Sequence, residues 1–141
     1  MSKRDRIRAA LNLLGFIFGL ASGCFAISDA TISILIVNNA LRSSGGAGLD
    51  ISSQIVISLC VVVAALGVLL VRGSYLVWKA RILGSAINLT SGIVLTGLSV
   101  ALFTIGGGVL GKFAFASSVE PILMSSLSVM SGSFSLIALF D

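Results

Sequence analysis

The sequence contains no histidine, only two cysteines and only one proline in 141 residues. Histidine is the commonest general acid–base group near neutral pH, and haem and zinc sites depend heavily on histidine and cysteine. Chemistry within this chain alone would therefore have to use five carboxylates, two thiols and one tyrosine. The composition predicts a protein that is not an enzyme and that holds no metal or other cofactor.

Charge is also scarce. Charged residues make up 10% of the chain, against roughly 25% in an average globular domain, whereas hydrophobic residues make up 57%. The mean hydropathy is +1.15. Nine basic and five acidic side chains are too few to cover the surface that a protein of this size exposes to water. The sequence therefore predicts that lipid surrounds the folded chain.

The basic residues flank apolar runs instead of forming a patch. On one predicted side of the membrane they are Lys3, Arg4, Arg6, Arg8, Arg72, Lys79 and Arg81, and on the other side they are Arg42 and Lys112. No motif that reads a nucleic-acid groove accompanies them, so a bilayer and not nucleic acid is the expected partner. Because cytoplasmic segments carry the excess of Lys and Arg, both termini are expected to be cytoplasmic. The protein is predicted to cross the cell membrane several times, and that membrane is expected to be a prokaryotic plasma membrane.

Four apolar stretches are long enough to cross a bilayer, since about 20 helical residues span a hydrocarbon core of about 30 Å. The expected spans are 9–28, 51–71, 82–105 and 119–140. They predict an all-α integral membrane protein, a four-helix bundle that occupies residues 1–141 as a single domain. The connections are an outer segment at 29–50, an inner loop at 72–81 and an outer loop at 106–118. Segment 30–41 either prolongs the first helix or lies along the surface, and a strand is also open there.

Small residues recur at helical spacing on three of the expected helices. On the first helix, Gly15, Gly19 and Gly23 share one face, where another helix can approach closely. We expect this face to pack within the chain, and the alternative is dimerisation or docking to a partner. The other residues expected to pack helices are Gly84, Asn88 and Gly92 on the third helix and Ser125, Ser128, Gly132 and Ser135 on the fourth.

A few polar residues fall within or beside the apolar spans. The Asn88 amide requires hydrogen-bond partners in a dry region, which predicts an interhelical clasp or, alternatively, the lining of a solute path. Asp29 falls at the far end of the first span, and Glu120 completes a capping box with Ser117 at the start of the fourth. Buried carboxylates in membranes are functional by default, so Asp29, Asn88 and Glu120 are the candidates for a polar path.

Aromatic and basic side chains alternate in the predicted inner loop. Tyr75 and Trp78 lie among the cations Arg72, Lys79 and Arg81. Amphipathic aromatics and long cationic side chains favour the headgroup level of a bilayer. We expect these five residues to anchor the inner interface.

These patterns favour a small non-catalytic membrane protein that serves as an accessory or structural subunit of a larger membrane protein complex. Its expected partners are the bilayer and other membrane subunits or further copies of itself. The small-residue faces and the absence of a soluble domain support this hypothesis. The alternative is an oligomeric channel or transporter for an ion or small solute.

Overall fold

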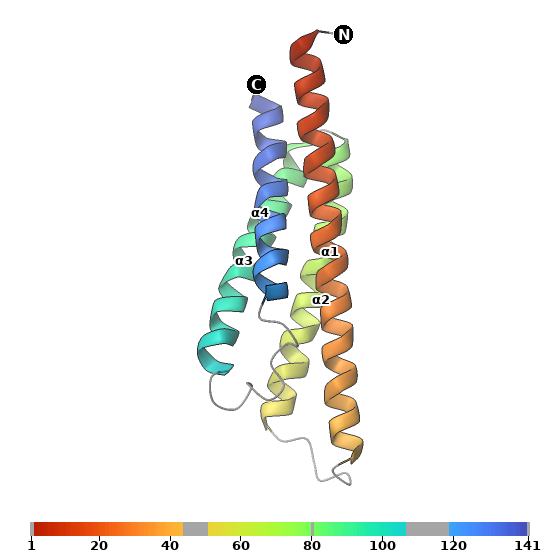
Figure 1. Ribbon diagram of the computed structural model, residues 1–141, viewed down its shortest axis with the longest axis vertical. Helices are drawn as coiled ribbons and strands as arrows, with labels where there is room; N and C mark the ends of the chain where they lie inside the picture. The colour runs from red at the N-terminus through yellow and green to blue at the C-terminus, as the bar shows by residue number, and fades with distance from the viewer. Residues whose placement is uncertain (1, 44–50, 80, 107–118, 141) are drawn as a thin grey trace.

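The computed structural model describes residues 2–43, 51–79, 81–106 and 119–140, and its elements over these residues are four α-helices. The helices are α1 (Lys3–Ser43), α2 (Ile51–Trp78), α3 (Ile82–Gly106) and α4 (Val119–Phe140). Figure 1 shows them as one elongated bundle with the N- and C-terminal ends of the chain at the same end. The predicted all-α, four-helix architecture is confirmed.

The four helices form a ring in which chain neighbours are spatial neighbours. α1 packs against α2 and α4, and α3 packs against the same two helices. Consecutive helices run in opposite directions, which is the up-and-down arrangement typical of bundles with short connections. At the end remote from the termini the helices are staggered, because α1 and α2 continue well beyond the start of α4.

The first helix continues beyond the predicted span of 9–28, and of the alternatives left open for segment 30–41 the structure shows prolongation of the helix. α1 is 41 residues long, about 60 Å at 1.5 Å per residue, and it continues through the whole of segment 30–41. No glycine or proline occurs between residues 24 and 43 to end it. The length rule used for the prediction measures the thickness of a bilayer, and a helix need not stop where the hydrocarbon stops. Asp29 consequently lies within α1 and not at its end.

The predicted inner loop at 72–81 is wrong over residues 72–78, because these residues are helical and complete α2. Gly73 lies inside the helix, where tertiary packing overrides its weak helix propensity. The turn that follows is tight: the Arg81 N–H donates to the Leu76 carbonyl at 3.1 Å, and the Gly84 N–H donates to the Arg81 carbonyl at 3.0 Å. These bonds allow α2 to end at Trp78 and α3 to begin at Ile82, only a few residues later.

The bounds of α3 and α4 match the spans expected at 82–105 and 119–140. Residues 107–118 of the predicted outer loop, and residues 44–50 of the outer segment, lie outside the described part of the chain. Three helical segments are long and apolar enough to cross a membrane, namely Lys3–Leu35, Ile57–Trp78 and Ile122–Phe140. The described apolar part of α3, Ile82–Leu98, is shorter. These properties are compatible with a multi-pass membrane protein.

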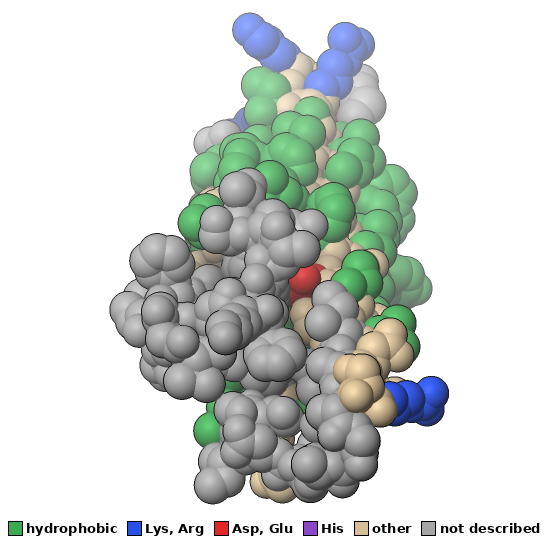
Figure 2. All heavy atoms as spheres, turned by 60° about the horizontal axis from the view of Figure 1, so that its bottom comes forward, with side chains coloured by type: hydrophobic (Ala, Val, Ile, Leu, Met, Phe, Trp, Pro, Cys, Tyr) green, Lys and Arg blue, Asp and Glu red, His purple; other side chains and the backbone are tan. Residues whose placement is uncertain are grey.

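The surface of the bundle is more apolar than much of its interior. Phe25, Ile82 and Ile122 are 50%, 61% and 63% exposed. Figure 2 shows hydrophobic side chains over most of the described surface that it presents, with basic groups toward the two ends. A bundle in water buries its large apolar side chains and exposes polar ones. The opposite distribution seen here is compatible with surroundings of hydrocarbon.

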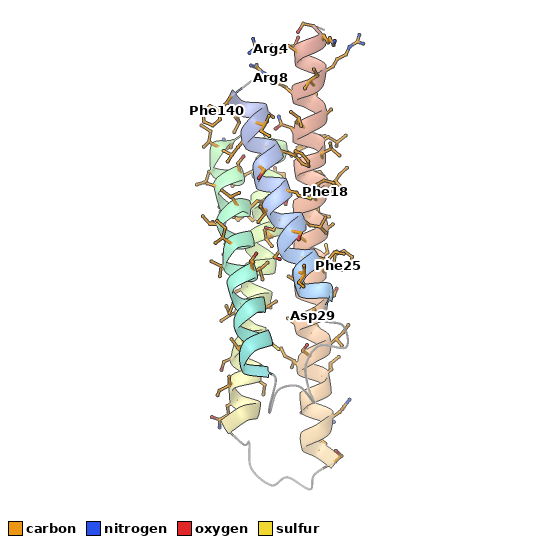
Figure 3. The ribbon with its side chains drawn as sticks, turned by 60° about the vertical axis from the view of Figure 1, so that its left-hand side comes forward. Arg4, Arg8, Phe18, Phe25, Asp29 and Phe140 are labelled. Carbon is orange, nitrogen blue, oxygen red and sulfur yellow. The ribbon has the colours of Figure 1, made fainter. Side chains whose placement is uncertain are left out.

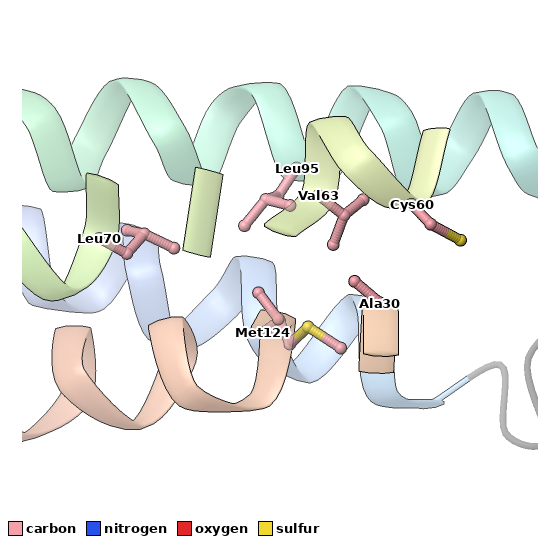
Figure 4. Packing of buried hydrophobic residues seen from close by; sticks show 7 residues of the cluster. Ala30, Cys60, Val63, Leu70, Leu95 and Met124 are labelled. Carbon is pink, nitrogen blue, oxygen red and sulfur yellow. The ribbon is translucent and has the colours of Figure 1, made fainter. Parts of the chain in front are cut away.

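The interior has two regions of different chemistry. Toward the end remote from the termini the core is apolar, as Figure 4 shows, and consists of Ala26, Ala30, Cys60, Val63, Leu70, Leu95 and Met124. Elsewhere the buried side chains include a set of hydroxyl and amide groups, namely Ser22, Ser74, Ser85, Asn88, Ser91, Ser125, Ser128, Ser131 and Ser135. A polar core of this kind holds together only if its groups bond to one another.

The free end of α1 is closed by a capping box. The Asp5 N–H donates to the Ser2 hydroxyl at 3.2 Å, and the Ser2 N–H donates to the Asp5 carboxylate at 2.9 Å. These reciprocal bonds satisfy two N–H groups that the first helical turn leaves without partners. The basic N-terminal segment is therefore helical from Lys3 onward.

Candidate functional site

All four helices meet at one polar layer centred on Asn88 of α3. The Asn88 Nδ2 donates to the Ser131 hydroxyl of α4 at 2.7 Å and to the Ser74 hydroxyl of α2 at 3.4 Å. Gly19 of α1 closes the fourth side, because a methyl carbon at Gly19 would lie 2.6 Å from Nδ2 and 2.3 Å from the Ser74 Oγ. We call these four residues the Asn88 clasp.

The hydrogen bonds in the clasp have one possible direction. The Ser74 hydroxyl donates its hydrogen to the Leu70 carbonyl at 2.7 Å, and the Ser131 hydroxyl donates to the Gly15 carbonyl. Each hydroxyl has a single hydrogen, so both can only accept from a third group. Asn88 supplies that group, because its amide carries two N–H donors. The clasp therefore requires a donor at position 88.

Further hydrogen bonds join the helices beside the clasp. The Ser128 hydroxyl of α4 donates to the backbone carbonyl of Asn88 at 2.7 Å. One level away, the Ser22 hydroxyl of α1 donates to the Met124 carbonyl of α4 at 2.6 Å. Together with the bond from Ser131 to Gly15, these bonds tie α4 to both of its neighbours. Each one stabilises a membrane bundle by only about 0.6–2 kcal/mol, so the stabilisation is distributed.

Two buried polar atoms have no hydrogen-bond partner among the described residues in this region, the Asn88 Oδ1 and the Ser85 Oγ. The Asn88 Oδ1 faces Gly73, where a methyl carbon would lie 2.2 Å from it. The hydrogen that glycine carries at that position points at the oxygen, which is a weak C–H···O contact. Gly73 therefore leaves free the space that the Asn88 amide oxygen occupies, whereas a side chain at position 73 would fill it.

The other predicted packing glycines lie where backbones approach closely. Gly15 faces the Ser131 carbonyl, and Gly23 faces the Gly67 carbonyl, so the glycine face of α1 packs within the chain against α4 and α2. Gly84 faces the backbone of α2 at Val77 and Gly73, and Gly92 and Gly132 face the α3–α4 contact. Added methyl carbons at Gly23, Gly84, Gly92 and Gly132 would lie 2.5–2.9 Å from their nearest atoms.

The serine-rich seam predicted on α4 faces inward. Ser125, Ser128, Gly132 and Ser135 are all buried. Ser125 donates to the Ile122 carbonyl at 3.0 Å, and Ser135 donates to the Ser131 carbonyl at 2.8 Å. Such bonds to the preceding turn make serine tolerable inside a membrane helix.

Sequence reasoning missed five members of this polar core, namely Ser22, Ser74, Ser85, Ser91 and Ser131. Ser74 falls in the predicted inner loop at 72–81, because the hydropathy pattern predicts that the helix ends at residue 71. Ser131 lies next to the predicted seam, and a helix that contacts two neighbours buries a face wider than one seam. Ser22 stands beside Gly23 on the glycine face, and that position was the signal that could have identified it.

Asp29, one of the two carboxylates expected to line a polar path, is not brought to Asn88. Asp29 is half-buried within α1, ten residues beyond Gly19, and Figure 3 shows it near the end of α4 where that helix begins. Asp29 and Ser33 lie close enough to the Cys60 thiol of α2 to interact with it. The Glu120 side chain and its predicted capping box with Ser117 lie outside the described residues. Of the members of that predicted set whose side chains are described, Asn88 lies inside the clasp and Asp29 does not.

The five predicted anchors gather at the end of the bundle that holds the termini. Arg72, Tyr75, Trp78, Lys79 and Arg81 are all exposed. The Lys79 ammonium lies 4.7 Å from the centre of the Tyr75 ring, and the Trp78 ring packs on Phe16 of α1 at 5.3 Å between ring centres. Figure 3 shows Arg4 and Arg8 at the same end, beyond the end of α4 at Phe140.

The chemistry of the clasp is that of amides and hydroxyls, which neither titrate near neutral pH nor carry electrons. Its geometry is suited to joining helices. Over the described residues no group of three or more Cys, Asp or Glu side chains stands together as a metal site would require. Comparison of the chain with protein-family models, curated proteins and solved structures finds no match.

Proposed function

We propose that this protein is a non-catalytic integral membrane protein that serves as an accessory subunit of a larger membrane protein complex. The inverted distribution of its side chains supports insertion in a bilayer. The basic residues near the termini and at the turn from α2 to α3 share one end of the bundle, so that both termini are cytoplasmic by the excess of Lys and Arg.

The observation that carries the subunit proposal is the outer face of α3. Gly97 is exposed there, and a methyl carbon on it would have no atom within 4 Å. Thr90 and Ala86 are exposed on the same face, two and three turns nearer the start of the helix. Small residues that face outward gain nothing from lipid, whereas they allow a neighbouring helix to approach closely. A helix of another subunit is the occupant that this face fits.

The variant Gly97→Leu tests this proposal. Inside the chain the new side chain meets open space, so the melting temperature in detergent should stay within a few degrees of the parent. Against a partner helix it would collide, so partners that co-purify with the tagged parent at a fixed ratio should be lost. Cys24→Leu is the matched control, because Cys24 is exposed on α1, diagonally across the bundle. Equal partner recovery from Gly97→Leu and the parent would refute the proposal.

A second candidate function is an oligomeric channel or transporter for an ion or small solute. The buried hydroxyls around Asn88 favour it, because they provide polar groups within an apolar bundle. The clasp itself is filled by side-chain atoms, so a path would have to form between copies. Purification as a homogeneous homo-oligomer would support this function. Reconstituted protein should then lose solute flux on Asp29→Asn, and unchanged flux in that variant would count against it.

A further inference from the structure

A strip of exposed residues runs along the outer face of α2 from its middle to its end. The positions are separated by four, three, four, three and four residues, which keeps them on one side of a helix. In order toward the end of the bundle that holds the termini, these residues are Val61, Ala65, Val68, Arg72, Tyr75 and Lys79, and all are exposed. We call them the α2 strip. Its first half is apolar, and its second half carries two cations around one phenol.

Arg72 stands at an unusual depth in this strip. It lies six residues before Trp78, about 9 Å along the helix axis, and Trp78 is an aromatic of the kind that marks the headgroup level. An exposed guanidinium at that depth faces acyl chains, an environment that strongly disfavours a charge without a counterion. No ion pair joins Arg72 to a carboxylate in the described part of the chain. A negative group from outside the protein can neutralise it.

The Lys79 side chain approaches Arg72 from the end of α2. Its ammonium lies 4.7 Å from the centre of the Tyr75 ring, so the side chain folds back along α2 toward Arg72. The phenol of Tyr75 lies between the two cations in the strip and carries an O–H donor. Contact between Trp78 and Phe16 of α1 holds the adjacent indole against the bundle. Two cations and one donor therefore lie on two successive exposed turns of the strip.

We propose that the α2 strip binds one acidic phospholipid of the cytoplasmic leaflet. Its phosphate would bridge Arg72 and Lys79 beside the Tyr75 hydroxyl, and its acyl chains would lie along Val61, Ala65 and Val68. The choice of an acidic lipid follows from charge complementarity, because a zwitterionic headgroup would bring an ammonium of its own to a basic surface. This inference rests on insertion in a bilayer and not on the partner proposed for α3.

The single Trp78 beside the strip provides the readout. The full chain is reconstituted alone in phosphatidylcholine vesicles that contain a minor fraction of phosphatidylglycerol, brominated near the glycerol end of its acyl chains. Quenching of Trp78 should exceed that produced by the same fraction of brominated phosphatidylcholine. In the double variant Arg72→Gln/Lys79→Gln the preference for the acidic lipid should fall by about 25-fold, since each cation near an anionic headgroup contributes roughly a factor of five.

The matched control is Lys3→Gln/Arg4→Gln, which removes the same charge from the same end of the bundle but away from the strip. It should keep the preference of the parent. Equal quenching by the two brominated lipids in the parent would overturn the proposal, and so would an equal loss in both double variants. Competition by soluble glycerol phosphate would also overturn it, because the site would then take a free anion. Melting temperatures in pure phosphatidylcholine establish that each variant is folded, and neither result depends on a partner subunit.

Discussion

Gly132→Ala is expected to destabilise the bundle by about 2–3 kcal/mol, which is the upper part of the range for overpacking a well-packed core. A methyl carbon at Gly132 would lie 2.8 Å from the Leu89 backbone nitrogen and Cβ and 2.9 Å from its Cα. Backbone atoms cannot rotate away as a side-chain tip can, so α3 and α4 must separate. That separation also stretches the bond from Asn88 to Ser131, which joins the same two helices.

The matched comparison is Gly97→Ala on α3, where the added methyl group meets no atom within 4 Å. Removal of a glycine from a helix interior with nothing to obstruct the methyl group should stabilise it by roughly 0.5–1 kcal/mol. Unfolding in mild detergent, followed by circular dichroism and by Trp78 fluorescence, measures both variants. Equal stability of the two alanine variants would contradict the close backbone contact between α3 and α4.

Asn88→Asp is expected to be the more damaging of two substitutions at the clasp. The hydroxyls of Ser74 and Ser131 donate to carbonyls and can only accept at position 88, so a carboxylate would face two oxygen lone pairs in a dry core. An uncompensated buried charge costs about 3–5 kcal/mol. Asn88→Ala removes the donor without adding charge and should cost about 1–3 kcal/mol.

The pH dependence separates these two effects. Protonation of the N88D carboxyl group restores one donor, so part of the loss of stability should recover as the pH falls. Asn88→Ala should show no such recovery. Thr90→Ala is the control on the same helix, because Thr90 is exposed and its hydroxyl bonds only to carbonyls of α3 itself, at 2.8 and 3.1 Å. Similar stability of N88D and Thr90→Ala would show that position 88 does not require a donor.

The helices were predictable to the extent that their ends coincide with changes in hydropathy. The start of α3 follows a basic turn at Lys79 and Arg81, and its apolar run ends at a cluster of glycines, so both ends are marked in the sequence. The continuation of α1 beyond residue 28 and of α2 beyond residue 71 was not marked. Helical hydrogen bonds extend wherever no residue prevents them, whereas hydropathy reports only which part of the helix suits lipid.

The clasp was partly predictable, for a related reason. Asn88 was identifiable because an amide in an apolar run must find partners, but its partners depend on which helices are neighbours. Ser131 rather than Ser128 receives the amide N–H, and Ser128 bonds to the backbone of Asn88 instead. Helical periodicity places both serines on the inner side of α4 without assigning either one to a helix. That assignment follows only from the order of the four helices in the ring.

The unbroken length of α1 has a mechanical consequence. Its 41 residues form one rod of about 60 Å that reaches from the basic end of the bundle to Arg42, without a proline to act as a hinge. If the rod tilts by about 5° around the clasp near Gly19, its longer arm swings its far end by roughly 3 Å. A small displacement at the basic end of the bundle would thus be transmitted, enlarged, to the opposite end.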